Sequence, residues 1–85
     1  MDLIRTERFK RDFKRLDCAT QDRALEALDR FLADPRHPSL HAKKMEGTDE
    51  IWEMRVSDRH RITCQHAKGA IILRRVGVHD ILSRP

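Results

Sequence analysis

Basic side chains and a histidine recur at alternating positions in the last third of the chain. The set comprises Arg55, Arg61, Arg75 and His79. Because alternate residues of a β-strand point to the same face of a sheet, these side chains are candidates for one charged face. An arginine guanidinium binds phosphate through paired hydrogen bonds, and an imidazole exchanges a proton near neutral pH. The pattern therefore predicts a surface suited to holding and cleaving a phosphodiester.

Three strands must position these side chains. Apolar and polar residues alternate over residues 52–56 and again over residues 61–65, and residues 71–78 form the most apolar segment. This period of two predicts strands, with the third strand lying centrally in the sheet. Polar residues 57–60 and the glycine-ended segment 67–69 are typical of the turns of β-hairpins. The three strands are therefore predicted to form an antiparallel meander.

Two amphipathic helices precede these strands. Thr6 is predicted to cap the first helix, and Thr20 to cap the second after a connection at residues 17–19. The second helix is expected to end at Asp34, because Pro35 disfavours a helical conformation in the residue before it. The apolar stripe of the first helix comprises Phe9, Phe13 and Leu16. The predicted buried face of the second comprises Ala24, Leu25, Leu28, Phe31 and Leu32.

The order of the elements predicts an α+β fold. A short strand at residues 2–5 precedes the helices, and residues 35–50 have no regular period. The helices are expected to form a hairpin that packs on one face of an antiparallel sheet. The other face is then exposed or covered by a partner. With 85 residues, residues 1–85 are predicted to form a single domain.

Composition narrows the class of protein and of partner. The chain has 18 Lys and Arg against 14 Asp and Glu, which favours an anionic partner, although a solvated mixed surface also accounts for this balance. Cys18 and Cys64 show no metal-ligand spacing, and Cys64 is expected to be a small buried hydrophobe. No apolar run is long enough to cross a membrane. We therefore predict a cytoplasmic protein that uses no metal and no cofactor, and that has no membrane partner.

Three sequence motifs resemble those of a known superfamily. They are His37-Pro38-Ser39-Leu40, residues 52–62 (WEMRVSDRHRI) and residues 73–80 (LRRVGVHD). Together with the order of the elements, they resemble the RelE/ParE superfamily of type II toxins. The last motif is similar to the Arg-x-Gly-x-His ending of its YafQ-like branch. The resemblance implies a RelE-like fold and a basic toxin that a cognate acidic antitoxin neutralises.

The resemblance also implies an activity, with two alternatives. Many relatives enter the ribosomal A site and cleave mRNA there without a metal, which implies an endoribonuclease, or mRNA interferase. Members of the ParE branch instead inhibit DNA gyrase and cleave no nucleic acid. An inactive module that only binds the antitoxin is the third possibility. The chain contains no tyrosine, which several active relatives use, and it ends six residues after His79, so these alternatives stay open.

Three residues receive catalytic roles from the resemblance. Arg61 matches the arginine that contacts the scissile phosphate, and His79 matches the catalytic histidine at the end of the last strand. Glu53 stands where RelE carries a lysine, and it is a second possible proton carrier. The alternatives are an ion pair of Arg61 with Asp58 or Glu53, a turn hydrogen bond for His79, and a purely ionic role for Glu53.

Four further basic residues are predicted to bind the RNA. They are Arg55 and Arg75 on the strands and Lys43 and Lys44 in the irregular segment. A basic loop can follow a phosphate backbone, although a solvated loop accounts equally well for the two lysines. Trp52 is expected to pack in the core rather than to stack on a base, since it alternates with apolar residues.

Overall fold

A computed structural model describes residues 2–47 and 50–85 of the chain. Its elements, in chain order, are β1 (Asp2–Arg5), α1 (Glu7–Lys14), α2 (Cys18–Ala33), the 3₁₀-helix η1 (Pro38–Leu40), β2 (Lys43–Lys44), β3 (Ile51–Arg55), β4 (His60–Ala67), β5 (Ala70–Val78) and the 3₁₀-helix η2 (His79–Ser83). The predicted order of one strand, two helices and a three-strand meander is confirmed.

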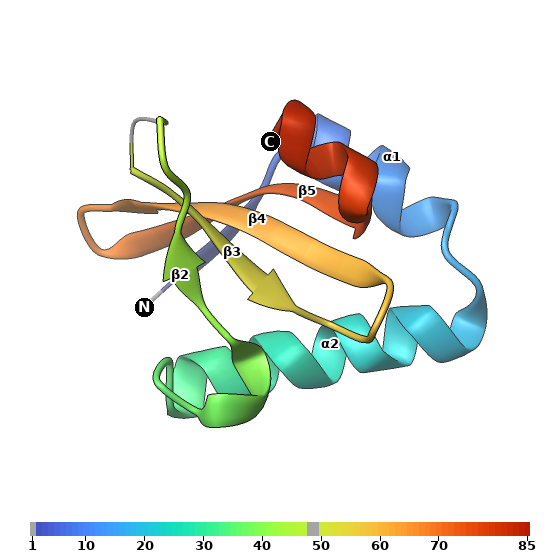
Figure 1. Ribbon diagram of the computed structural model, residues 1–85, viewed down its shortest axis with the longest axis horizontal. Helices are drawn as coiled ribbons and strands as arrows, with labels where there is room; N and C mark the ends of the chain where they lie inside the picture. The colour runs from blue at the N-terminus through green and yellow to red at the C-terminus, as the bar shows by residue number, and fades with distance from the viewer. Residues whose placement is uncertain (1, 48–49) are drawn as a thin grey trace.

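The five strands form one sheet in the order β1-β5-β4-β3-β2 (Figure 1). Strands β3, β4 and β5 pair antiparallel, but β1 pairs parallel with β5. The sheet is therefore mixed, whereas the sequence predicted only antiparallel strands. A parallel pair needs a long crossover, which here includes both helices. The short strand β2 lies in a segment predicted to be irregular, and it pairs with β3 at the sheet edge.

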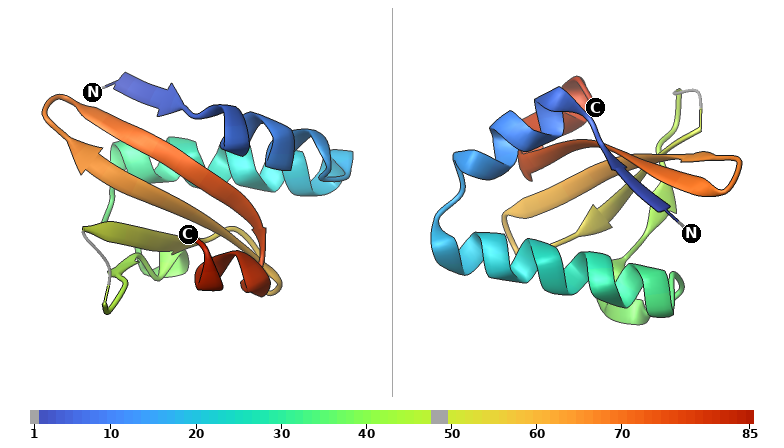
Figure 2. Two further views of the ribbon diagram at one scale, coloured as in Figure 1. Left: turned by 90° about the horizontal axis from the view of Figure 1, so that it is seen from above. Right: turned by 180° about the vertical axis from the view of Figure 1, so that it is seen from behind.

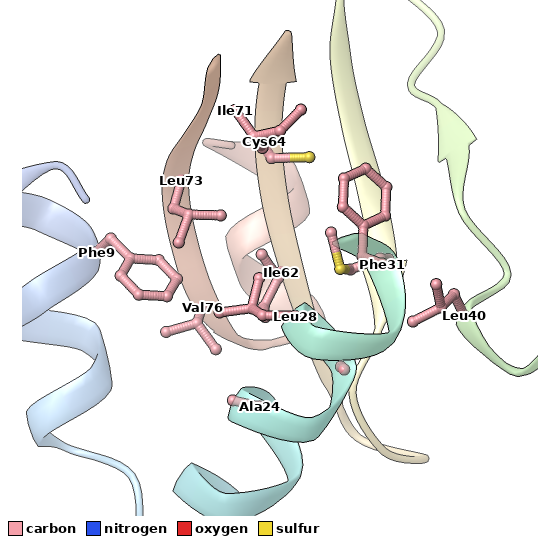
Figure 3. Packing of buried hydrophobic residues seen from close by; sticks show 12 residues of the cluster. Phe9, Ala24, Leu28, Phe31, Leu40, Ile62, Cys64, Ile71, Leu73 and Val76 are labelled. Atoms are coloured by element: carbon pink, nitrogen blue, oxygen red, sulfur yellow. The ribbon is translucent and has the colours of Figure 1, made fainter. Parts of the chain in front are cut away.

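The helices cover one face of the sheet, and η2 lies on the other face (Figures 1 and 2). Figure 3 shows side chains of α1 and α2 directed toward those of β4 and β5. The fully buried members of this core include Leu40, Met54, Ile62, Leu73 and Val76. Since these residues alternate with the core residues of β3 and β4, the side chains of Glu53, Arg55 and Arg61 point to the face that carries η2.

The first helix begins at the predicted cap, but the second does not. Thr6 caps α1 as predicted, and its hydroxyl oxygen accepts a hydrogen bond from the backbone N–H of Phe9 at 3.1 Å. The predicted cap of α2 is wrong, because α2 begins at Cys18 and Asp17 is its cap. The Asp17 carboxylate accepts the N–H of Thr20 at 2.8 Å, and this hydrogen bonding lowers the pKa of Asp17. The cap therefore lies three residues earlier than predicted, and α2 gains Cys18, Ala19 and Thr20 at its start.

The buried face of α2 is centred one residue away from the predicted stripe. Ala24, Leu28 and Phe31 are buried as predicted, together with Ala27. Leu25 and Leu32 are 45% and 43% exposed, so their predicted burial is wrong. The buried residues follow the i, i+3, i+4, i+7 spacing of one helical face, which leaves residues 25 and 32 at its margin.

The outer edge of β5 is covered by two elements in succession. β1 pairs with β5 as far as Leu73, where the Thr6 hydroxyl donates to the Leu73 carbonyl at 2.8 Å. Beyond this point, the buried Asp12 of α1 accepts the N–H of Val76 at 3.3 Å and two N–H groups of Arg75 at 2.9 and 3.0 Å. The hydrogen bond to Asp12 raises the pKa of Arg75. This ion pair fastens α1 to the sheet.

We predict that Asp12→Ala lowers the free energy of unfolding by about 3 kcal/mol, because it leaves the mostly buried Arg75 and the N–H of Val76 unpaired. Urea unfolding measures the change. Asp29→Ala removes an exposed aspartate of α2 and is the matched control, with an expected effect below about 0.5 kcal/mol. Equal unfolding midpoints for the two variants would contradict this account.

Candidate functional site

A groove of about 420 Å³ lies on the sheet face opposite the helices. It is lined by His41, Ala42, Lys43, Glu53, Arg55, Arg61 and His79. Five of the seven residues that the sequence singled out for the site thus lie together in space. They come from β2, β3, β4 and η2, and the segment before β2 contributes the remaining two.

Cross-strand pairing arranges the charged groups in two rows. In the first row, Arg55 of β3 lies opposite Arg61 of β4, which in turn lies opposite Gly77 of β5. In the second row, Lys43 of β2 lies opposite Glu53 of β3. Directly opposed side chains in a sheet have Cβ atoms about 5 Å apart. The register of the sheet therefore brings the cations and the carboxylate into one small area.

Arg61 is held by backbone carbonyls rather than by a carboxylate. Its Nη1 atom donates to the carbonyl oxygens of Ser57 at 2.7 Å and His60 at 2.9 Å. Its hydrogen bonds thus differ from the predicted alternative of an ion pair with Asp58 or Glu53. A guanidinium has five N–H donors, so these two bonds orient the group without exhausting it. Arg61 can therefore donate to an anion in the groove.

The other charged residues of the groove form ion pairs with one another or at its rim. Glu53 is almost fully buried, and Lys43 Nζ lies 3.6 Å from one of its carboxylate oxygens. Asp58, in the turn between β3 and β4, accepts a hydrogen bond from Arg55. Each of these pairs offsets part of the repulsion among the cations, so the groove stays basic without isolated charges.

His79 is positioned by the contact of η2 with β5. It is the exposed first residue of η2, and Ile81 of the same turn is 4% exposed. A Cβ atom on Gly77 would lie only 2.9 Å from Cγ2 of Ile81. Only glycine lets η2 approach the sheet this closely, which gives the glycine of the Arg-x-Gly-x-His ending a steric reason.

Two predicted substrate-binding residues lie outside the groove. Arg75 is directed to α1, where it pairs with Asp12. Lys44 lies opposite Trp52 in the β2–β3 pairing and forms an exposed ion pair with Glu50 at 3.7 Å. Because successive strand residues point to opposite faces, Lys44 and Lys43 cannot share the groove. The substrate-binding roles of Arg75 and Lys44 therefore stay predictions, and the geometry of the groove does not favour them.

Trp52 and Cys64 belong to the packing of the helix-covered face. Trp52 packs against the core, and its ring meets His66 edge-on with centroids 5.7 Å apart. Burial raises the pKa of the Cys64 thiol to about 12, so this residue stays a thiol and not a nucleophilic thiolate at neutral pH. Both placements agree with the expectation from the sequence.

His41 is the histidine of the groove that the sequence reasoning missed. It follows η1 and adopts a left-handed backbone conformation with φ of 45°, which is uncommon outside glycine. His37, four residues earlier, caps η1 by accepting the N–H of Ser39. Within residues 2–47 and 50–85, no three side chains of His, Cys, Asp or Glu gather where they could hold a metal ion. The signal for His41 was its place next to Leu40, which is anchored in the core.

A separate hollow, of about 390 Å³, lies between α1 and α2. Its floor is apolar and comprises Phe9, Phe13, Leu25 and Leu28. Three cations also line it, namely Arg5, Lys10 and Lys14. This hollow is distinct from the groove and has the character of a docking surface for an apolar segment with negative charge.

In the part of the chain that the structure describes, no helix is long and apolar enough to cross a bilayer.

Three solved structures illustrate the similarity of this fold to known ones. The YoeB/ParE toxin from Agrobacterium tumefaciens superposes with a TM-score of 0.79 at 16% identity, covering 93% of this chain and 99% of that one. YafQ from E. coli strain BL21(DE3) gives 0.80 at 10% identity, with 95% and 96% covered. The RelB–RelE antitoxin–toxin complex from Methanococcus jannaschii gives 0.76 at 18% identity, with 95% of both chains covered. These similarities confirm the RelE-like fold.

Sequence comparison identifies the family. The family model of the ParE toxin of type II toxin–antitoxin systems (parDE) matches residues 3–81, which is nearly the whole chain. A search of curated proteins found no significant match. The fold and the family model together confirm the resemblance to the RelE/ParE superfamily. The chain therefore belongs to the ParE toxin family, and it is a toxin of a type II toxin–antitoxin system.

Proposed function

We propose that this toxin is a metal-independent endoribonuclease that cleaves mRNA in the ribosomal A site and so inhibits translation in the cytoplasm. The observation that carries the proposal is the composition of the groove opposite the helices, which brings Arg61 and Arg55 together with His79, His41 and Glu53. Such a set can bind a phosphodiester and move protons at the same place. The Arg-x-Gly-x-His ending, similar to that of the YafQ-like branch, also supports it.

The reaction uses a nucleophile that the RNA itself supplies. The 2′-hydroxyl attacks the neighbouring phosphorus, so a 2′-O–P bond forms and the P–O5′ bond breaks. The protein must accept the proton of the 2′-hydroxyl, stabilise the negative charge of the phosphorane and protonate the 5′-oxygen as it leaves. All three tasks fall to side chains of the groove.

The geometry suggests a division of these tasks. Arg61, already oriented by two carbonyl oxygens, stabilises the phosphorane with its free donors, and Arg55 binds the same phosphate. His79 accepts the proton of the 2′-hydroxyl. His41 protonates the leaving oxygen, and Glu53 is the alternative proton donor; Lys43, which pairs with Glu53, also contacts the RNA backbone.

We expect His79→Ala to slow RNA cleavage by about 10²–10⁴-fold, since it removes a general base. Arg61→Ala is expected to cost about 10²–10³-fold, since it removes a donor to the transition state. The measurement is the rate of mRNA cleavage on programmed ribosomes, with and without a chelator. A 2′-deoxy substitution at the cleaved nucleotide should abolish the reaction.

Matched controls come from outside the groove. His66→Ala removes a histidine that contacts Phe31 and Trp52, and Arg8→Ala removes an exposed arginine of α1. Both should cleave at close to the parent rate. His41→Gly, by contrast, removes the proposed proton donor and is expected to slow cleavage, while glycine relaxes the left-handed backbone and so should not destabilise the fold. An uncut mRNA, or full activity of His79→Ala, would rule out the mechanism.

Gly77→Ala is predicted to reduce cleavage by up to about 10²-fold, because its methyl group would push η2, and with it His79, away from the groove. Ile81→Ala removes the Cγ2 atom with which that methyl group collides. The double variant Gly77→Ala/Ile81→Ala should therefore regain activity relative to Gly77→Ala alone. An unimpaired Gly77→Ala toxin would show that the contact does not position His79.

We also propose that the cognate antitoxin presents an acidic amphipathic segment to the hollow between α1 and α2. The apolar floor suits the hydrophobic side of such a segment, and Arg5, Lys10 and Lys14 suit its carboxylates. The RelB–RelE structure from Methanococcus jannaschii, one chain of which shares this fold, is an antitoxin–toxin complex, which supports a protein partner of this kind.

Affinity for the antitoxin should fall as salt rises from ~0.1 to ~0.5 M, because rim charges are screened over a shorter distance. Lys10→Ala/Lys14→Ala should bind more weakly and show a smaller salt dependence, while Arg8→Ala/Arg11→Ala removes the same charge elsewhere on α1. Titration calorimetry measures both quantities. Affinity that does not change with ionic strength would refute the electrostatic part of the proposal.

Inhibition of DNA gyrase is the second candidate function. The matching family model is that of the ParE toxin. The chain also contains no tyrosine, and a toxin that does not cleave RNA would not need one. Supercoiling by gyrase in the presence of excess toxin separates the two functions: inhibition together with a fully toxic His79→Ala variant supports the gyrase alternative. A protein that is harmless on expression but binds its antitoxin would be the inactive module.

A further inference from the structure

A second polar hollow, of about 360 Å³, adjoins the groove. The two share His41 and Arg55 among their lining residues, so they meet at these two side chains. The second hollow continues from this junction toward α2, where Arg23 and Arg30 line it. The groove described above is therefore one part of a longer basic surface.

The arginines of this second hollow are presented by one face of α2. Arg23, Ala27 and Arg30 follow one another at the i, i+4, i+7 spacing, so they lie in a row along the helix. Ala27 is 3% exposed and too small to fill the space between the two arginines. Arg30 is oriented by Ser39, to whose hydroxyl its Nη1 donates at 3.1 Å.

The lining has the chemistry of a phosphate site. Three arginines face two acidic residues, Glu26 and Asp58, and Asp58 is already paired with Arg55. The hydroxyl oxygens of Ser39 and Ser57 also line it, and they accept hydrogen bonds from Arg30 and from the backbone N–H of His60. A mostly polar surface with guanidinium forks suits a phosphodiester better than a hydrophobic peptide segment.

We propose that this second hollow binds the phosphodiester next to the one that is cleaved, so that the RNA strand runs from the groove past His41 and Arg55 onto α2. The inference rests on the proposed function, because it concerns the substrate of the same site. A single strand carries one phosphate for each nucleotide, so a strand held in the groove must place its next phosphate on an adjoining surface. Arg23 and Arg30 are thereby positioning residues for the substrate.

The test measures RNA binding apart from cleavage. In a His79→Ala background, fluorescence anisotropy with a labelled single-stranded octanucleotide should show binding about tenfold weaker for Arg23→Ala/Arg30→Ala. The slope of log affinity against log salt should also fall by about 0.7 for the phosphate contact that is lost. A dinucleotide, which carries one phosphodiester and fills only the groove, should compete equally well against both proteins.

Arg8→Ala/Arg11→Ala is the matched control, since it removes two exposed arginines from α1 and the same net charge. If both double variants lose equal affinity, general electrostatic attraction explains the effect and the inference is overturned. Unchanged RNA binding by Arg23→Ala/Arg30→Ala, or a loss confined to antitoxin binding, overturns it as well. If the expected loss is found but the parent toxin never cleaves RNA, the second hollow stands as an RNA site and the proposed nuclease function fails.

Discussion

The outer edge of β5 is the constraint on which the rest of the structure depends. A strand edge within a folded protein must find partners for its N–H and C=O groups. β1 supplies them only as far as Leu73, and Thr6 and Asp12 take over where the chain turns into α1. The pairing of Asp12 with Arg75 therefore settles where α1 lies, and α1 in turn helps to cover the core beside α2.

The same strand carries the candidate site on its other side. The face of β5 that meets the helices is apolar, whereas on the opposite face Gly77 leaves room for Ile81 and for the turn that begins with His79. Packing and chemistry are thus divided between the two faces of one sheet. This division lets a chain of 85 residues use most of its apolar side chains for a single core while its cations line an open groove.

The groove depends on compensation of the positive charges that line it. Arg55 and Arg61 lie directly opposite each other, an arrangement that repulsion disfavours. Asp58 compensates one of them and carbonyl oxygens hold the other, while Lys43 accompanies the nearly buried Glu53. An incoming phosphate would complete this compensation, which is the physical reason why the groove favours an anionic ligand.

Local patterns in the sequence determined much of this protein. The period of two along β3 and β4 determined that Glu53, Arg55 and Arg61 share a face, because alternation is a property of each strand alone. Tertiary structure decided which elements became neighbours, including the parallel β1–β5 pair and the pairing of the short β2 with β3. It also decided that Arg75 pairs with Asp12, 63 residues away in the sequence, and that His41 lines the groove. Periodicity assigns a side chain to a face, but only long-range pairing and register decide what that face meets.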